Sequence, residues 1–288
     1  MRHDRGRYVR ASLVDVMRVG PAMKVGEAIT SAGGMRANED RVGHRGTLAW
    51  VIDGATDLYD DKALPADSDV QWLVDSIGER LTQAGADDYR GSAAELLTLT
   101  AAEVAREQAA LSFPPNRVPP ACSIAVCVDQ GTRYDLARIG DATAVVDGVR
   151  PVVLSTDYFD QREAAAVATN EGEANRVVAA MHQRRLHTMT SGDVESVFSG
   201  HPLRQLRPHT ACGEWTHTDC ILLCTDGFAR LVTDYRLYRS WTQVITDARD
   251  RGLHYLEKLI RDAESQPGSG GGRFKRADDI AALLLTPN

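Results

Sequence analysis

Apolar runs that stop at glycine or at an acidic residue recur along the chain, and they predict buried strands. Two of them end alike, because LAWVIDG (48–54) and ILLCTDG (221–227) each lead directly into Asp-Gly. Continuous apolar and β-branched runs of this length are typical of strands buried on both faces. Turn residues between the central runs favour an antiparallel meander there. The predicted strands are 47–52, 121–129, 134–141, 143–148, 219–225 and 279–285.

Helical patterns lie between these strands. In 69–83 the apolar residues recur at helical spacing, and 92–111 opens with Ser92 and Glu95 in the arrangement of a capping box. The segment 160–185 is predicted to be mostly helical, and 238–264 is predicted to be a helix.

Three segments lack a regular pattern. FPPNRVPP (113–120) ends the second helix, either as a rigid connector or as a polyproline recognition motif. Residues 187–213 have no sustained period, which is typical of a lid or binding loop, and GSGGG (268–272) predicts a flexible tip.

The order of elements is strand, two helices, three strands, helical segment, strand, helix, strand. This order differs from a regular βαβ alternation and predicts an α+β fold with antiparallel sheets rather than a Rossmann fold. The absence of internal repeats and of a long polar linker indicates a single domain over 1–288.

Composition narrows the class of protein. With 288 residues and a net charge of −7, the chain is expected to be a globular protein that does not bind nucleic acid. The five cysteines match no zinc or CxxC spacing, so reduced thiols and a cytoplasmic location are expected. No apolar stretch reaches the length of a membrane span. Residues 1–20 are interpreted as either a mobile lead-in or an added edge strand.

Acidic residues gather where predicted strands begin or end. A single Asp-Gly after a strand is typical of a plain turn. Several such carboxylates brought together would instead supply the oxygen ligands that Mg²⁺ and Mn²⁺ prefer, in a site with two metal ions. The residues at these strand ends are Glu39, Asp40, Asp53, Asp141, Asp226, Asp278 and Asp279.

The order of these motifs resembles that of the metal-dependent (type 2C) protein serine/threonine phosphatases, in particular a bacterial branch. The segments that carry the resemblance are RANED, VIDG, RIGDATAVV, LLCTDGFARLV and RADDIAALLL, from about residue 33 to residue 285. The resemblance implies a four-layer α-β-β-α sandwich with a core over about 25–286 and a flap over about 155–213. It also implies a monomeric signalling enzyme that hydrolyses phosphoserine and phosphothreonine in the substrates of a Ser/Thr kinase, using water activated by two Mn²⁺ or Mg²⁺ ions.

The resemblance also assigns roles to residues. Asp53 would bridge two metal ions, the Gly54 carbonyl would help to bind one of them, and Asp226 and Asp278 would complete the other. Glu39 and Asp40 would hold metal-bound waters, and Asp141 with Asp226 would support a third, weaker metal. Arg36 would bind the substrate phosphate.

Some positions depart from the family pattern. Ala55 stands where eukaryotic members place a histidine as the general acid, so the proton would come from a metal-bound water, from Asp57 or from the lid. His187 is a weaker candidate for that donor, and Arg184 and Arg185 are either a solvated helix end or a site for an anionic substrate. Arg36 lies three residues before Glu39, where many members have four.

Two other functions remain open on sequence grounds. The same metal site could serve a phosphatase of a small phosphorylated metabolite. A catalytically weak protein could also use the fold to bind phosphorylated partners without hydrolysing them.

Overall fold

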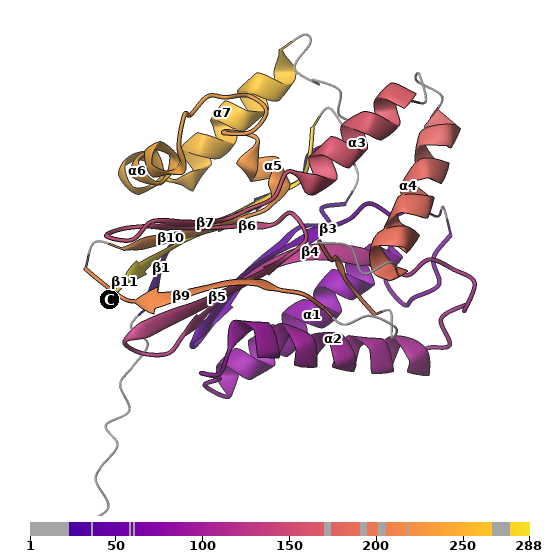
Figure 1. The fold of residues 1–288 in the computed structure, drawn as a ribbon, viewed down its shortest axis with the longest axis horizontal. Helices are drawn as coiled ribbons and strands as arrows, with labels where there is room; N and C mark the ends of the chain where they lie inside the picture. Colours follow the sequence, from indigo (N-terminus) through magenta and orange to yellow (C-terminus); the bar gives the residue numbers. More distant parts are fainter. Residues whose placement is uncertain are drawn as a thin grey trace, which may run out of the picture.

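The computed structural model describes residues 23–35, 37–57, 59, 61–169, 174–190, 195–200, 206–217, 219–266 and 277–288. Within these ranges the chain forms two antiparallel sheets that pack face to face, with helices on both outer sides (Figure 1). The predicted α+β class and the layered sandwich are therefore confirmed.

Among the described residues, the first sheet has five strands in the order β1-β11-β10-β6-β7. Each neighbouring pair is antiparallel. The strands are β1 (Met23–Ser31), β6 (Thr143–Asp147), β7 (Val152–Leu154), β10 (Cys220–Cys224) and β11 (Ile280–Pro287).

The second sheet follows the order β2-β3-β4-β5-β9, with the short β8 paired to β4. These pairings are also antiparallel. The strands are β2 (Arg41–Arg45), β3 (Leu48–Gly54), β4 (Ala121–Asp129), β5 (Arg133–Ile139), β8 (Phe198–Ser199) and β9 (His209–Glu214).

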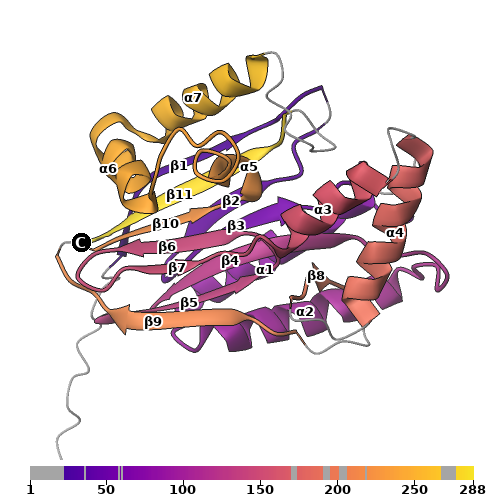
Figure 2. The same cartoon turned by 45° about the horizontal axis from the view of Figure 1, so that its top comes forward.

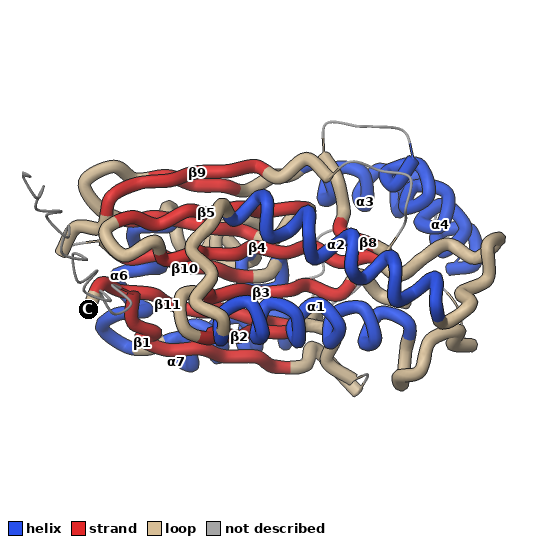
Figure 3. Tube along the Cα trace, turned by 90° about the horizontal axis from the view of Figure 1, so that it is seen from below, coloured by secondary structure: helices blue, strands red, loops and turns tan. Residues whose placement is uncertain are grey.

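Helices cover the outer faces of both sheets. The second sheet carries α1 (Asp69–Ala86) and α2 (Ala93–Ala110), which lie beside each other across its strands (Figure 3). The first sheet carries α5 (Asp226–Ala229), α6 (Trp241–Arg251) and α7 (Leu253–Ser265). A further pair, α3 (Tyr158–Thr169) and α4 (Ala174–Thr190), stands at one end of the sandwich (Figure 2). None of the described helices is both long and apolar enough to cross a membrane.

Strand β4 shows why the central runs are apolar throughout. Ile124 and Val126 belong to the cluster under α1 and α2, whereas Ala125 and Cys127 belong to the cluster between the two sheets. Alternate side chains of a strand point to opposite faces, so a strand covered on both faces needs apolar residues at every position.

Several predicted elements are confirmed, with small shifts at their ends. They include the strands near 47–52, 121–129, 219–225 and 279–285, the helices near 69–83 and 92–111, and the connector at 113–120. Ser92 is the N-cap of α2, but its side chain makes no capping hydrogen bond, so the capping box is incomplete.

Other predictions are wrong. The meander over 121–148 is broken, because β4 and β5 pair in the second sheet whereas β6 pairs with β10 in the first. The helix over 238–264 is two helices that meet at Gly252, where φ is +87°. The irregular segment 187–213 contains the end of α4 together with β8 and the start of β9. Residues 1–20 and 268–272 lie outside the described ranges.

Candidate metal and phosphate site

Asp53 ends β3, where it lies opposite Ser123 of β4. The apolar residues before it are fully buried between the layers, so the strand holds this carboxylate in a fixed place at the end of the sandwich. Burial raises the pKa of Asp53 well above its ordinary value, and the charges of Asp226, Asp40, Asp141 and Asp278 raise it further. Asp53 is therefore surrounded by the acidic residues that the sequence predicted to lie near it.

Asp226 reaches the same place from the other sheet. It is the first residue of α5, directly after β10, and its backbone N–H donates to Asp53 Oδ2 at 3.4 Å. Two strand ends from different sheets thus bring Asp53 and Asp226 into contact across 173 residues of sequence.

The glycines that follow these two aspartates are required by close packing. A Cβ on Gly54 would lie 2.6 Å from the Glu39 carbonyl oxygen, and a Cβ on Gly227 would collide with the Asp279 carbonyl oxygen. In both Asp-Gly pairs the absent side chain lets another backbone segment of the site approach.

Asp40 is the most deeply buried acid of the group. It is 3% exposed, and burial raises the pKa of its carboxyl well above the ordinary value. A hydrogen bond from Thr225 opposes this rise, whereas Asp226, Asp279 and Asp278 add to it. No described group donates a hydrogen bond to Asp40 Oδ2, although that oxygen is buried. A buried carboxylate oxygen without a donor is suited to a cation.

Asp141 follows β5 and faces β4. The Ser123 hydroxyl donates to Asp141 Oδ1 at 2.5 Å, and the Asp141 N–H donates to Ser123 Oγ at 3.1 Å. Burial is the main reason why the pKa of Asp141 rises to about 7, with contributions from Asp226 and from Asp160 of α3. Ser123, a residue to which the sequence pattern gave no role, thus supports Asp141.

Asp278 lies just before β11 and is bound to a cation of the chain. Arg230 Nη2 is 2.5 Å from Asp278 Oδ2, and the Asp279 N–H donates to Asp278 Oδ1 at 3.1 Å. The side chain of Arg230 is 3% exposed. Nothing in the sequence pattern pointed to Arg230, which lies 48 residues before its partner.

Asp279 has a structural role that the sequence did not reveal. Its two oxygens accept hydrogen bonds from the N–H groups of Gly33 at 2.8 Å and Glu39 at 2.7 Å. It therefore holds the segment that carries Glu39 and Asp40 against the start of β11. The Asp278-Asp279 doublet was the available signal, since one acid of the doublet faces the site and the other holds the backbone.

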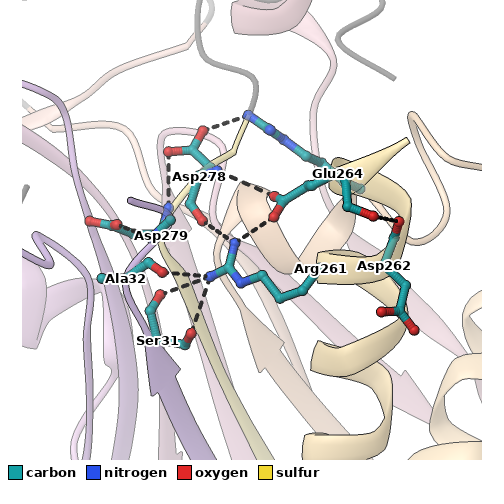
Figure 4. A network of polar contacts seen from close by, with 10 residues as sticks. Ser31, Ala32, Arg261, Asp262, Glu264, Asp278 and Asp279 are labelled. Carbon is teal, nitrogen blue, oxygen red and sulfur yellow. Dashed lines mark hydrogen bonds and ion pairs between the residues drawn. The ribbon is translucent and has the colours of Figure 1, made fainter. Parts of the chain in front are cut away.

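Figure 4 shows how α7 supports the same region. Arg261 Nη1 donates to the Asp278 carbonyl oxygen at 2.8 Å and to Glu264 Oε2 at 2.8 Å. Arg261 Nη2 donates to the carbonyl oxygens of Ser31 and Ala32, each at 3.2 Å. One guanidinium thereby joins the end of β1 to Asp278, two residues before β11, through backbone groups.

On the phosphate side, Arg36 lies outside the described residues. The half-buried Arg185 of α4 donates to the Thr56 carbonyl oxygen at 3.0 Å. Burial lowers the pKa of Arg185 to about 10, whereas the charges of Asp57, Glu39 and Tyr59 oppose that change. This helix therefore places a guanidinium beside the loop that follows Asp53.

The predicted proton donors differ in their surroundings. Asp57 Oδ2 accepts from the Asp69 N–H at 2.9 Å, so this carboxylate supports the start of α1. His187 lies exposed in the last turn of α4. Ala55 contributes a backbone N–H to the Ala121 carbonyl oxygen at 3.0 Å.

The donor set fits a hard divalent cation by its chemistry. Carboxylate oxygens come together from five separate segments, and the buried Asp40 Oδ2 lacks a donor among the described groups. In the described residues, however, no three His, Cys, Asp or Glu side chains converge tightly enough to enclose an ion. The residue types and their negative charge therefore suit a divalent cation. The carboxylates would have to move closer together to bind one.

Stability without divalent cations is expected to fall as pH rises from about 4, the ordinary pKa of an aspartate, to about 7, the raised pKa of Asp141. In this range the folded protein keeps a proton that the unfolded chain releases, so raising the pH favours unfolding. Thermal unfolding in EDTA at pH 5 and pH 8 measures the effect, and Asp141→Asn should make the dependence shallower. A melting temperature that rises over this range would contradict the assignment.

Comparison with known proteins identifies the fold. No protein-family model matches the sequence, and no curated protein matches it significantly. Among solved structures, the Mycobacterium tuberculosis serine/threonine phosphatase PstP/Ppp is 16% identical with a TM-score of 0.57, over 92% of this chain and 99% of that one. The catalytic domain of PstP in complex with two manganese ions is 17% identical with a TM-score of 0.58, over 92% and 97% of the two chains.

A third similar structure is PppA, described as a key regulatory component of the type VI secretion system in Pseudomonas aeruginosa. It is 16% identical with a TM-score of 0.56, over 93% of this chain and 99% of that one. At these identities the likeness concerns the fold, and it extends over nearly the whole chain. The chain therefore has the fold of the bacterial type 2C serine/threonine phosphatases, as the order of its acidic motifs predicted.

Proposed function

We propose that the protein is a metal-dependent phosphatase that hydrolyses phosphoserine and phosphothreonine monoesters of other proteins. The observation that carries this proposal is the gathering of Asp40, Asp53, Asp141, Asp226 and Asp278 at one end of the sandwich. The same fold binds two manganese ions in the structure of the PstP catalytic domain. The five free cysteines agree with a cytoplasmic location.

Each acidic residue has a distinct part in the proposed site. Asp53 would help to hold two Mn²⁺ or Mg²⁺ ions, the Gly54 carbonyl would help to hold one of them, and Asp226 and Asp278 would hold the other. Glu39 and Asp40 would hold water molecules, and Asp141 with Asp226 would bind a third ion more weakly. Such ions supply a nucleophile at neutral pH and neutralise phosphate charge.

The chain's own residues would position the substrate. Arg36 and Arg185 are the candidates for binding the phosphate, because a guanidinium offers paired donors that match phosphate oxygens. Arg185 is already held beside Asp57 and Glu39 by α4, which places a positive charge next to an acidic site. A dianionic phosphate could then enter despite the surrounding carboxylates.

Hydrolysis of p-nitrophenyl phosphate tests the proposal directly. The protein is expected to hydrolyse this substrate in the presence of Mn²⁺ or Mg²⁺ and to lose the activity in EDTA. A panel of phosphoserine and phosphothreonine peptides, assayed beside sugar phosphates, then separates a protein phosphatase from a metabolite phosphatase. Absence of any turnover at saturating Mn²⁺ would instead support a protein that only binds phosphorylated partners.

Arg185→Met is expected to raise KM for a phosphopeptide about tenfold, the effect of losing one charge-assisted hydrogen bond, with a smaller change in kcat. Arg184→Met is the matched control, because Arg184 is the neighbouring residue and donates to the Arg162 carbonyl oxygen within the helix pair. Steady-state kinetics of the two variants measures the difference. Equal KM values for the two variants would show that Arg185 does not bind the substrate phosphate.

A further inference from the structure

Arg230 is a buried cation placed inside the acidic site by the segment that supplies Asp226. Its backbone N–H donates to the Asp226 carbonyl oxygen at 3.1 Å, so one helical turn separates the two residues. Its side chain is 3% exposed and forms the 2.5 Å ion pair with Asp278 Oδ2. The motif TDGFAR thus brings a carboxylate and a competing positive charge to the same place.

The carboxylates of the group differ in their neighbours. The charges that act most strongly on Asp40, Asp53 and Asp141 all belong to other carboxylates. Asp278, in contrast, gives one oxygen to Arg230 and the other to the Asp279 N–H. A cation that binds Asp278 through Oδ2 must therefore first separate an ion pair in which Arg230 is 3% exposed and Asp278 is 18% exposed, and that separation reduces the affinity for the cation.

We propose that Arg230 competes with a divalent cation for Asp278, and that this competition weakens one metal position relative to the others. The inference rests on the proposed function, because it assumes that the carboxylates hold Mn²⁺ or Mg²⁺. The ion that is held without Asp278 binds first. The ion that needs Asp278 binds only when Arg230 gives up its partner, so metal occupancy responds to the available concentration of the ion.

Arg261 provides a matched control for this role. It reaches the same aspartate from α7, but it binds the backbone carbonyl of Asp278 rather than its carboxylate (Figure 4). Losing Arg261 removes support for the loop without releasing the Asp278 side chain. Arg261→Met therefore tests for a general loss of structure, whereas Arg230→Met tests for competition.

The experiment is a calorimetric titration of the metal-free full-length protein with Mn²⁺, with bound ions counted by electron paramagnetic resonance. Wild type is expected to show a tighter and a weaker class of sites. Arg230→Met should tighten the weaker class about tenfold, a usual size for coupling between two binding events. Arg230→Lys should keep the wild-type affinity because it keeps the charge, and Arg261→Met should not bind more tightly.

Thermal unfolding gives a second readout that is independent of activity. Arg230→Met should melt below wild type in EDTA, because the ion pair with Asp278 is lost from a group of carboxylates that repel one another. Its melting temperature should rise more on addition of Mn²⁺ than that of wild type does. Should Arg230→Met fail to fold in EDTA, Arg230→Gln, which keeps a hydrogen-bond donor, is titrated in its place with the same expectation.

The outcomes separate this inference from the proposed function. Equal or weaker Mn²⁺ binding in the Arg230→Met or Arg230→Gln variant would overturn the competition while leaving a metal-dependent phosphatase intact. Tighter Mn²⁺ binding by the Arg230 variant, together with no turnover of any phosphate ester by wild type, would support the competition and overturn the proposed function. Absence of Mn²⁺ binding in wild type and variants alike would overturn both.

Discussion

Replacing Asp53 by asparagine is expected to reduce Mn²⁺-dependent phosphatase activity by at least about a thousandfold, the scale on which a central electrostatic group contributes to catalysis. Asp53 lies between the carboxylates of both sheets, and asparagine keeps its shape while removing the charge that would hold two ions together. The folded protein should remain, because one repelling charge is removed from a buried group of acids. In EDTA at pH 8 the melting temperature of Asp53→Asn should equal or exceed that of wild type.

The matched control for Asp53→Asn is Asp75→Asn. Asp75 is also an aspartate near this part of the molecule, but it is 53% exposed and pairs with Arg41 at 2.8 Å. It should keep wild-type turnover, since exposed ion pairs contribute little. Initial rates with p-nitrophenyl phosphate measure both variants, and an Asp53→Asn enzyme within a few-fold of wild type would refute the bridging role.

Replacing Arg138 by methionine is expected to lower the free energy of unfolding by up to about 3–5 kcal/mol, because it removes one partner of a buried ion pair. Glu195 Oε2 also lies 3.3 Å from His209 Nε2, and that contact would remain. Arg138 Nη2 lies 3.1 Å from Glu195 Oε1, and the two side chains are 3% and 6% exposed. Arg138 also donates to the Gly140 carbonyl and, at 3.0 Å, to the Ser155 carbonyl. The ion pair thus joins β5 to the segments on either side of the α3–α4 pair, next to Asp141.

Two further variants isolate the cause of that loss. Arg138→Met combined with Glu195→Leu should recover part of the stability, because no buried carboxylate then remains beside the missing arginine. Arg90→Met removes an arginine from an exposed pair with Asp88 and should cost less than about 1 kcal/mol. Chemical denaturation compares all three, and an Arg138→Met loss no larger than that of Arg90→Met would show that the buried pair contributes little.

The acidic residues of the site could be predicted from the order of motifs in the sequence. Asp53, Asp226, Asp40, Asp141 and Asp278 were each recognisable, because a carboxylate at the end of an apolar run is a local feature. Their neighbours were not recognisable. Arg230 contacts Asp278 across 48 residues of sequence and Ser123 contacts Asp141 across 18, and no local pattern marks such partners.

The sequence by itself determined the buried strands, the two helices over the second sheet and the acids at the strand ends. Strands such as β3, β4, β10 and β11 are apolar at nearly every position because both of their faces are covered. Such a run of consecutive apolar residues can be recognised in the sequence alone. Edge strands are different: β1 and β9 bury fewer residues and pair on one side only, so their pattern was too weak to predict.

Only the tertiary structure decided which strands pair and which charges meet. β6 follows β5 closely in sequence, yet it joins the other sheet, because pairing with β10 buries its apolar residues between the first sheet's helices and the second sheet. The ion pair of Arg230 with Asp278 likewise exists because β10 and β11 are neighbours and α5 turns back over them. Such contacts depend on how distant segments close on one another, which is a property of the packed chain rather than of any stretch of it.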